Sequence, residues 1–373
     1  MRPPLLIKSF GHMANGNVRF ANTASPTGLS PSAVASVYHL SGLAANSGAG
    51  AGQVIAIVDA FHDPNALSDL NTWNSQYGYP QLSTCTSLQQ AGACFEQADP
   101  QGTPTVNKGW VLEESLDIEW AHAEAPAAKI VLVEAASASN ADLFGAAQYA
   151  GSTLGATEVS MSFGGTDSAS DTQFDADLAH PGTLYAASAG DSGHGAEYPA
   201  ASPNVIAVGG TTLTGCSGTS CAGFSGESAW SGSGGGASTS ESLPGYQSSY
   251  TGPVSGASSI SALTGGKRGI PDVSFEADPN TGVSVYDSTR YQLQSGWWTL
   301  GGTSVSAPNW AGILAAGAAA GQSTLQGDSH IYAGGSANLR DITSGTNGTC
   351  GTACTAGAGY DLVTGLGSPV NYP

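Results

Sequence analysis

Residues 301–308 read Gly-Gly-Thr-Ser-Val-Ser-Ala-Pro and lead into an alanine-rich run that predicts a helix from about Ser306 to Gly321. The paired glycines permit a tight, crowded backbone, so Ser304 stands where a Gly-rich segment meets a helix. Peptide N–H groups at a helix N-terminus favour developing negative charge, which suits a nucleophilic serine. Serine is also a frequent helix N-cap. The stretch alone is compatible with both roles.

Acidic residues far outnumber basic ones in this chain of 373 residues. Its 28 Asp+Glu against 9 Lys+Arg give a formal net charge of −19. Such a surface repels nucleic-acid phosphates and anionic membranes, so we expect neither as a partner. With few Lys and Arg, the chain gains little positive charge when acid protonates its carboxyls, which suits an acidic medium. A soluble acidic protein without that specialisation would have the same composition.

The six cysteines fall into three pairs that are close in sequence, and each pair lies in a loop-like stretch. No histidine cluster and no CxxC accompanies them, so local disulfides explain them better than zinc sites do. Disulfides indicate an oxidising compartment and therefore a secreted protein. No apolar run is long enough to span a membrane. The expected disulfides are Cys85–Cys94, Cys216–Cys221 and Cys350–Cys354.

Strand-like and helix-like segments alternate through the first half of the chain. Gln53–Ala60 is a continuous apolar run with β-branched residues, as in a buried parallel strand. The alternation predicts an α/β fold with a doubly wound, mostly parallel sheet flanked by helices. Besides residues 53–60, we expect strands at 129–134, 158–163, 183–189 and 204–208, and helices at 29–40, 65–77, 113–124, 141–154 and 172–178.

Residues 215–266 differ in composition, since Gly and Ser dominate and apolar periodicity is weak. We expect long surface loops with short strands here, within the same domain. Residues 1–12 end in Gly-His-Met and are interpreted as a cloning remnant outside the fold. Residues 13–373 are then expected to form a single domain.

Acidic residues stand at two places where catalysis is conceivable. Glu113 and Asp117 are four residues apart on a predicted helix and therefore share one face. Mutual repulsion would raise the pKa of one of them, so that it could hold a proton. A solvated acidic helix face would have the same spacing. Asp191 follows a predicted strand, at the edge of the sheet where parallel folds place ligands, although turn aspartates are also common there.

Five short motifs resemble those of subtilisin-like proteases and occur in the same order. In that fold the second motif supplies an asparagine to the oxyanion hole, whereas this chain has Asp191. Asp59 stands at the first strand, but none of the seven histidines lies in the His-Gly-Thr setting of the subtilisin base. A Ser-His-Asp triad is therefore not expected. The motifs are 161–165, 189–193, 198–200, 205–209 and 302–304.

This departure resembles the sedolisin family of serine-carboxyl peptidases, over residues 28–372. In the family the general acid/base stands four residues before the aspartate that orients it. In this chain that position is Glu113, not Glu114. Carried over residue by residue, the resemblance implies four roles: Ser304 as nucleophile, Glu113 as general acid/base, Asp117 as the acid that orients it, and Asp191 in the oxyanion hole.

These replacements form a coherent version of acyl transfer for low pH. Histidine would be protonated in acid, whereas glutamate keeps a basic fraction there. A carboxyl in the oxyanion hole must be neutral to donate a hydrogen bond, and acid supplies that state. We therefore expect maximal activity near or below about pH 4–5.

Two C-terminal segments, residues 341–348 and 356–361, combine carboxylates with glycine-exposed carbonyls. Hard oxygen ligands of this kind suit Ca²⁺, although Gly-rich turns with helper aspartates would look alike. The resemblance implies one structural calcium ion. Its ligands would be the side chains of Asp341 and Asp361 and the backbone carbonyls of Ile342, Gly357 and Gly359.

The resemblance also implies where a substrate would lie. Glu197 falls where certain relatives carry an acid near the primary pocket. A wall beside the bound peptide would be formed by Ser162, Phe163, Gly164 and Gly165.

We therefore expect a secreted, monomeric endopeptidase that cleaves proteins or peptides in acid through an acyl-enzyme. A tripeptidyl-peptidase on the same scaffold and a secreted binding protein without catalysis are the alternatives. The four catalytic-type residues argue against the latter, because decay would usually have replaced one of them. The resemblance implies an N-terminal prosegment before maturation. Nothing in this sequence resembles one, so the processed catalytic domain is expected.

Overall fold

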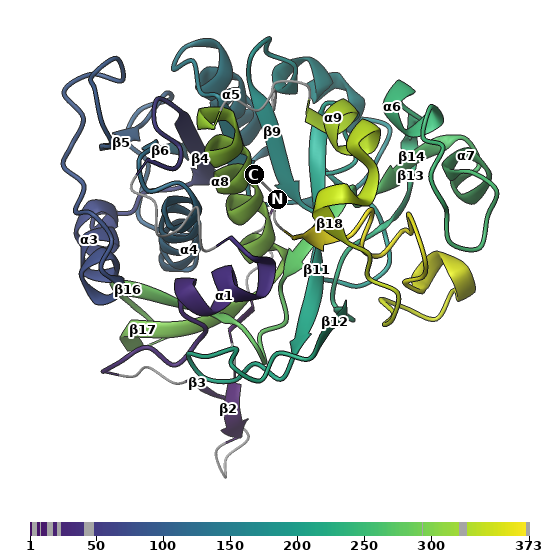
Figure 1. The fold of residues 1–373 in the computed structure, drawn as a ribbon. Helices are drawn as coiled ribbons and strands as arrows, with labels where there is room; N and C mark the ends of the chain where they lie inside the picture. The colour runs from purple at the N-terminus through teal and green to yellow at the C-terminus, as the bar shows by residue number, and fades with distance from the viewer. Residues whose placement is uncertain are drawn as a thin grey trace.

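The computed structural model describes residues 1, 6–7, 9–12, 18–20, 24–40, 48–292, 294–320 and 327–370. An eight-stranded sheet forms its centre, in the order β12-β11-β9-β7-β4-β6-β5, with β15 also paired to β11 (Figure 1). Its pairs are parallel except β11–β12. The predicted doubly wound, mostly parallel sheet is confirmed. The strands are β4 (Val54–Ala60), β5 (Phe95–Ala98), β6 (Lys129–Ala135), β7 (Glu158–Met161), β9 (Leu184–Ser188), β11 (Val205–Thr214), β12 (Gly226–Ala229) and β15 (Val273–Glu276).

Alternating side chains of the central strands serve two separate cores. In β4, Val54, Ala56, Val58 and Ala60 pack with residues of α5 (Asn140–Ser152). Ile55 and Ile57, on the opposite face, pack with residues of α3 (Ala66–Tyr77), α4 (Lys108–Glu124) and α8 (Thr303–Ala319). Because side chains alternate along a strand, the next residue of the isoleucine row, Asp59, lies on the face that α4 covers.

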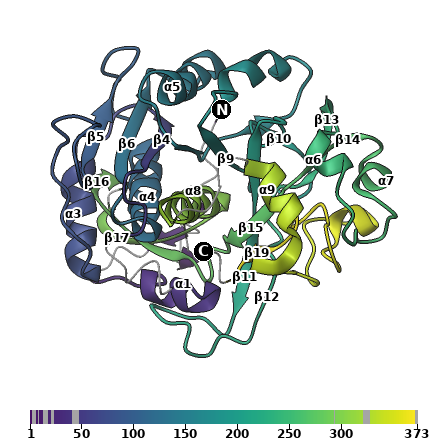
Figure 2. The ribbon, with the colours of Figure 1, turned by 45° about the horizontal axis from the view of Figure 1, so that its top comes forward.

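Two packed helices, α4 and α8, occupy the middle of the molecule (Figures 1 and 2). Helix α4 begins five residues before the predicted start because the side chain of Asn107 caps it, accepting a hydrogen bond from Gly109 N at 3.1 Å. Helix α8 begins at Thr303, directly after Gly302, whose φ of 108° favours glycine. Ser304 therefore lies in the first turn of α8.

An antiparallel hairpin that was not predicted, β16 (Val283–Tyr291) and β17 (Gln294–Gly301), leads into α8. The indole N–H groups of Trp73 and Trp120 both donate to the Ser284 backbone oxygen at 3.1 Å, which ties the hairpin to α3 and α4. Strand β1 (Leu6–Ile7) pairs with the end of β17, opposite Leu300 and Gly301. Part of the segment expected to lie outside the fold thus extends a sheet.

The Gly/Ser-rich region holds short strands, as expected, and also the short helices α6 and α7, which were not predicted. They are β12, β13 (Gly236–Ser242), α6 (Gly245–Ser248) and α7 (Ile260–Thr264), and β13 pairs with β14 (Lys267–Ile270). The remaining elements are β2 (Ser9–His12), β3 (Val18–Phe20), α1 (Pro31–Tyr38), β8 (Gly165–Thr166), η1 (Asp171–Leu178), β10 (Glu197–Tyr198), α9 (Gly327–Gly334), η3 (Gly335–Asn338), β18 (Leu339–Arg340), η4 (Gly351–Cys354) and β19 (Ser368–Pro369).

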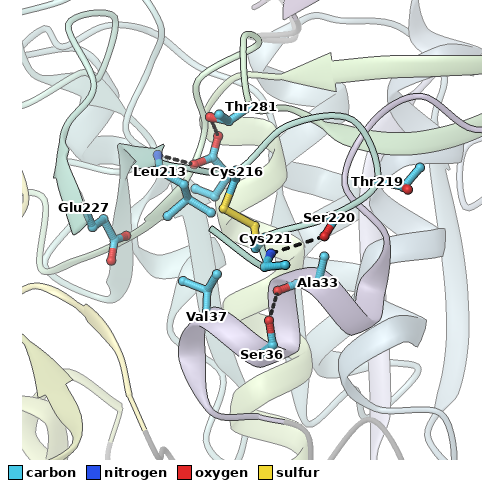
Figure 3. The surroundings of a disulfide bond; sticks show 12 residues. Ala33, Ser36, Val37, Leu213, Cys216, Thr219, Ser220, Cys221, Glu227 and Thr281 are labelled. Atoms are coloured by element: carbon cyan, nitrogen blue, oxygen red, sulfur yellow. Dashed lines mark hydrogen bonds between the residues drawn. A yellow bond between two sulfur atoms is a disulfide. The ribbon is translucent and has the colours of Figure 1, made fainter. Parts of the chain in front are cut away.

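All three expected disulfides are present. Cys216–Cys221 closes the loop after β11 and belongs to the same buried cluster as Ala33 and Val37 of α1 (Figure 3). The same loop is held to the start of α1 by a hydrogen bond from Ser30 Oγ to the Thr219 backbone oxygen at 3.0 Å. Within the described ranges, no helix combines the length and apolar character that a bilayer crossing requires.

Candidate active site

The four residues proposed as catalytic come together from three elements. Helix α4 carries Glu113 and Asp117, the first turn of α8 carries Ser304, and the loop after β9 carries Asp191. The side chains of Glu113, Asp117 and Ser304 are completely buried, and Asp191 is partly exposed. The site thus lies where the packed helices meet the carboxyl edge of the sheet, as expected for parallel folds.

Glu113 is the carboxyl group that faces Ser304. Burial raises the pKa of Glu113 well above its ordinary value, the charges of Asp117 and Asp191 add to that rise, and the nearby Ser304 hydroxyl opposes it. The hydroxyl and the carboxyl do not meet in normal hydrogen-bond geometry. Hydrogen bonds of this type often tighten only when substrate binds. The pair is therefore placed for proton exchange, with Glu113 biased toward its protonated form.

Asp117 lies one turn further along α4. Burial raises its pKa well above the ordinary value, and the Ser162 hydroxyl counteracts this rise. Ser162 Oγ also donates a long hydrogen bond, 3.4 Å, to the Ser304 backbone oxygen. Ser162, expected in the substrate wall, thus lies between Asp117 and the first turn of α8.

The carboxyl of Asp191 is fixed beside Ser304 by Thr303. Thr303 donates to Asp191 Oδ1 twice, from its backbone N–H and from its hydroxyl, each at 2.8 Å. The hydroxyl of Thr303 in turn accepts a hydrogen bond from Gly190 N at 3.1 Å. The residue before the serine therefore orients this carboxyl, a role that the sequence did not reveal.

Glu197 lies between Gly164, in the segment proposed to line the substrate site, and Gly190, which precedes Asp191. Strand β10 pairs with β8, placing Glu197 opposite Thr166 and Tyr198 opposite Gly165. A Cβ atom at Gly164 would stand 2.6 Å from Glu197 Oε2, and one at Gly190 would stand 2.6 Å from its carboxyl carbon. These glycines thus make room for the Glu197 carboxyl.

Phe163, another expected wall residue, points elsewhere. Its ring is completely buried in the core on the α5 side of the sheet, 6.2 Å from the ring of Phe144. Only its backbone is therefore available for contact with a peptide.

Asp59 is a component of the site that sequence reasoning missed. It is completely buried, and neither carboxyl oxygen has a hydrogen-bond partner among the described residues. Burial raises the pKa of Asp59 well above its ordinary value. The charges of Asp117, Glu113 and Glu134 raise it further. The signal was present in the strand, because Asp59 continues the row of Ile55 and Ile57 that faces α4.

The residues expected to bind calcium gather around one Gly-rich loop. Asp361 Oδ2 accepts a hydrogen bond from Gly357 N at 2.9 Å, and Asp341 Oδ2 accepts one from Gly359 N at 3.0 Å. Ile342, whose carbonyl is a further expected ligand, is buried directly after Asp341. Two carboxylates and several backbone carbonyls in one loop cluster fit a hard cation such as Ca²⁺.

Comparisons with known proteins identify the family of the chain. A family model described as the subtilase family matches residues 106–332. Sedolisin from Pseudomonas sp. (strain 101) is 33% identical over 244 residues, covering 58% of this chain and 38% of that protein. Kumamolisin from Bacillus sp. (strain MN-32) is 31% identical over 380 residues, covering 94% of this chain and 63% of that protein. The chain thus spans less than two thirds of either relative.

Solved structures give the same result at the level of the fold. Pseudomonas sedolisin, described as a serine-carboxyl proteinase and solved with two molecules of pseudo-iodotyrostatin, matches with a TM-score of 0.71 and 25% identity, over 93% of this chain and 96% of that one. A lanthipeptide protease shares only the fold, with a TM-score of 0.53 and 13% identity, over 91% of this chain and 90% of that one. The chain belongs to the subtilase family and, within it, to the sedolisins, the serine-carboxyl peptidases.

Proposed function

We propose that this protein is a secreted, acid-acting serine-carboxyl endopeptidase. The observation that carries the proposal is the environment of Glu113 beside Ser304. The groups that shift the pKa of Glu113 are Asp117, Ser304 and Asp191, and no histidine is among them. A carboxyl pair therefore takes the place that histidine holds in the usual serine-protease triad.

In the proposed reaction, ionised Glu113 takes the proton of Ser304 as Oγ attacks the scissile carbonyl. The same proton then passes to the leaving amine, and an acyl-enzyme remains. Water attacks this ester, Glu113 accepts the proton of that water, and it returns the proton to Ser304 Oγ as the acid product leaves. Because burial disfavours two charges side by side, Asp117 and Glu113 share one negative charge, and Asp117 orients Glu113.

Asp191 is the proposed oxyanion-hole donor. It must be protonated to donate to the tetrahedral oxyanion. Thr303 occupies Asp191 Oδ1 with two donated hydrogen bonds, so the acid proton belongs on Oδ2. An acidic medium thus supplies the neutral Asp191 that the reaction needs, while Glu113 reacts through the single negative charge that it shares with Asp117.

The peptide is proposed to lie along the backbone of residues 162–165, with Glu197 at the primary pocket between Gly164 and Gly190. A structural Ca²⁺ held by Asp341, Asp361 and the neighbouring carbonyls stabilises the C-terminal loops. Residues 13–373 act as one monomeric catalytic domain that is secreted after removal of an N-terminal prosegment. The disulfides and the absence of a spanning helix from the described ranges are compatible with secretion.

Casein digestion across pH, with wild type and Ser304→Ala compared, tests the proposal. The wild type should be most active near or below about pH 4–5, and Ser304→Ala should lose activity at an unchanged melting temperature. A peak at neutral pH, or equal activity of the two proteins, would refute the mechanism. Cleavage of an N-terminally blocked peptide would separate an endopeptidase from a tripeptidyl-peptidase.

A further inference from the structure

A second polar cluster lies at the carboxyl ends of β4, β5 and β6. His62 follows β4 by two residues, Asp99 directly follows β5, and Glu134 is the last residue but one of β6. One ligand-type atom from each of these residues lies within 4.8 Å of the other two. The register of the sheet produces this meeting, since β4 and β5 both pair with β6 in parallel and end beside Glu134.

Glu134 is held firmly at the centre of the cluster. It is completely buried, and its Oε1 accepts hydrogen bonds from Asp63 N at 2.7 Å and Gln97 Nε2 at 2.6 Å. Its Oε2 lies 2.8 Å from Nδ1 of His62. The side chain of His62 is 26% exposed and Asp99 is partly exposed, so solvent reaches the cluster from one side.

Two further carboxyl groups are buried near the cluster, and no described lysine or arginine forms an ion pair with them. Asp63 and Glu114 are completely buried, and Asp63 Oδ2 and both carboxyl oxygens of Glu114 lack hydrogen-bond partners among the described residues. Buried unpaired carboxylates are costly, and a bound cation would remove that cost.

We propose that His62, Asp99 and Glu134 bind a divalent transition metal ion of the zinc class. One imidazole nitrogen with two carboxylate oxygens is a ligand set for zinc and its neighbours, whereas calcium and magnesium take oxygen ligands. Ligand atoms around tetrahedral zinc stand about 3.3 Å apart, so a small rotation of His62 away from Glu134 accommodates the ion. Asp63 lies directly beside the site, since its backbone N–H donates to Glu134 Oε1.

The competing explanation is that His62 and Glu134 form an ion pair and nothing more. Titration with zinc chloride at pH 7.5 separates the two cases. The protein is used without any histidine tag, stripped of transition metals, and kept in calcium so that the proposed calcium site is not disturbed. Isothermal calorimetry measures stoichiometry and affinity, and the visible spectrum after cobalt(II) addition reports the coordination of the same site.

We expect one zinc ion per chain, a raised melting temperature and cobalt absorption bands. His62→Ala and Asp99→Asn, both at partly exposed positions, should each weaken zinc binding by more than about tenfold. His180→Ala, on the loop before β9, is the matched control and should bind as the wild type does. The proposal is overturned if the wild type binds no zinc, if His62→Ala and Asp99→Asn bind as tightly as the wild type, or if His180→Ala is the variant that loses binding.

Discussion

At the residue scale, Gly164 and Gly190 have a specific reason to be glycine. The Glu197 carboxyl fills the space where a side chain at either position would begin. Gly190 is constrained twice, because its φ of 108° also disfavours other residues. Gly164 has no such backbone constraint, so substitution there tests the contact with Glu197 alone.

Gly164→Ala should lower kcat/KM for a chromogenic peptide by about tenfold or more. The added methyl would stand 2.6 Å from Glu197 Oε2, so the carboxyl must leave its place at the proposed primary pocket. A loss of about 1.4 kcal/mol of transition-state binding there is a factor of ten. Steady-state kinetics of Gly164→Ala, Glu197→Ala and the double variant measure the coupling. The double variant should be no worse than Glu197→Ala. Additive losses would show that Gly164 acts independently of Glu197.

Four site residues could be proposed from sequence because the motifs around them are specific, and the structure places them together. Asp59 was considered only for its place in a subtilisin-like triad, since an acid inside a buried strand has no motif of its own. The burial of Phe163 could not be foreseen either. The same residues could line the substrate site with their side chains or with their backbone. Packing of the Phe163 ring against Phe144 shows that this residue offers only its backbone.

At the element scale, helices were predicted better than the strands that lie outside the central sheet. Helix α8 begins three residues earlier than predicted because the turn is made by Gly302 alone. The β16–β17 hairpin was missed because much of it is polar. Only its first part alternates buried valines with polar residues, and its tip is partly exposed. The burial of its inner face comes from α3 and α4, which sequence periodicity does not report.

Removal of the Cys216–Cys221 disulfide should loosen α1. Its loop is short, so the cross-link contributes about 2 kcal/mol at most through chain entropy. Its sulfurs, however, pack in one cluster with Ala33 and Val37. We expect the Cys216→Ala/Cys221→Ala protein to exchange the amide protons of α1 faster. The matched Cys85→Ala/Cys94→Ala protein, altered at the opposite edge of the sheet, should leave α1 unchanged. Equal exchange in wild type and both variants would contradict the packing argument.

Calcium removal should lower the melting temperature of the protein. The loop around Gly357–Gly359 is hydrogen-bonded to the carboxylates of both Asp341 and Asp361, and a hard cation bound there would hold the loop together. Differential scanning calorimetry with and without a chelator measures the effect. Asp341→Asn should melt at the lower temperature under both conditions, whereas Asp177→Asn should respond as the wild type does. If the chelator leaves the melting temperature of the wild type unchanged, the proposed calcium site is wrong.

At the scale of the whole molecule, buried carboxyls make stability depend on pH. Burial raises the pKa of Glu124 and of Glu158 to about 8 each. Below about pH 4 the folded and unfolded states both hold these protons, so their contribution is constant. Above that pH the unfolded chain loses its protons first, and folding becomes less favourable up to about pH 8. Stability is thus fully present in acid and declines toward neutrality.

The melting temperature should therefore be highest in acid and fall between about pH 5 and 8. Each raised carboxyl contributes up to about 1.4 kcal/mol for each pH unit of that window. Glu158→Gln removes one such group, so the loss of unfolding free energy between pH 4 and 7 should shrink by about 2–3 kcal/mol. Urea unfolding at both pH values measures this difference. Glu96→Gln, at a partly exposed position on β5, should lose as much unfolding free energy between pH 4 and 7 as the wild type does. An unchanged loss in Glu158→Gln would disprove the linkage.

The alternation of strands and helices was sufficient to predict the class of fold but not the order of the strands. Crossover connections let β4 lie between β6 and β7, although β5 and β6 both follow β4 in the chain. The sequence of a buried apolar strand does not show which strands pair with it, because all such strands are similarly apolar. The order, and with it the meeting of Asp59, Glu114 and Glu134, results from packing of the whole sheet.

The three disulfides join cysteines nine, five and four residues apart. None of them links distant parts of the chain. A single backbone cut outside those small loops therefore yields two fragments that share no covalent bond, and electrophoresis in detergent without reductant would separate them. Survival of this protein among other proteases depends on how well its loops resist the first cut, because no cross-link would preserve the molecule after it.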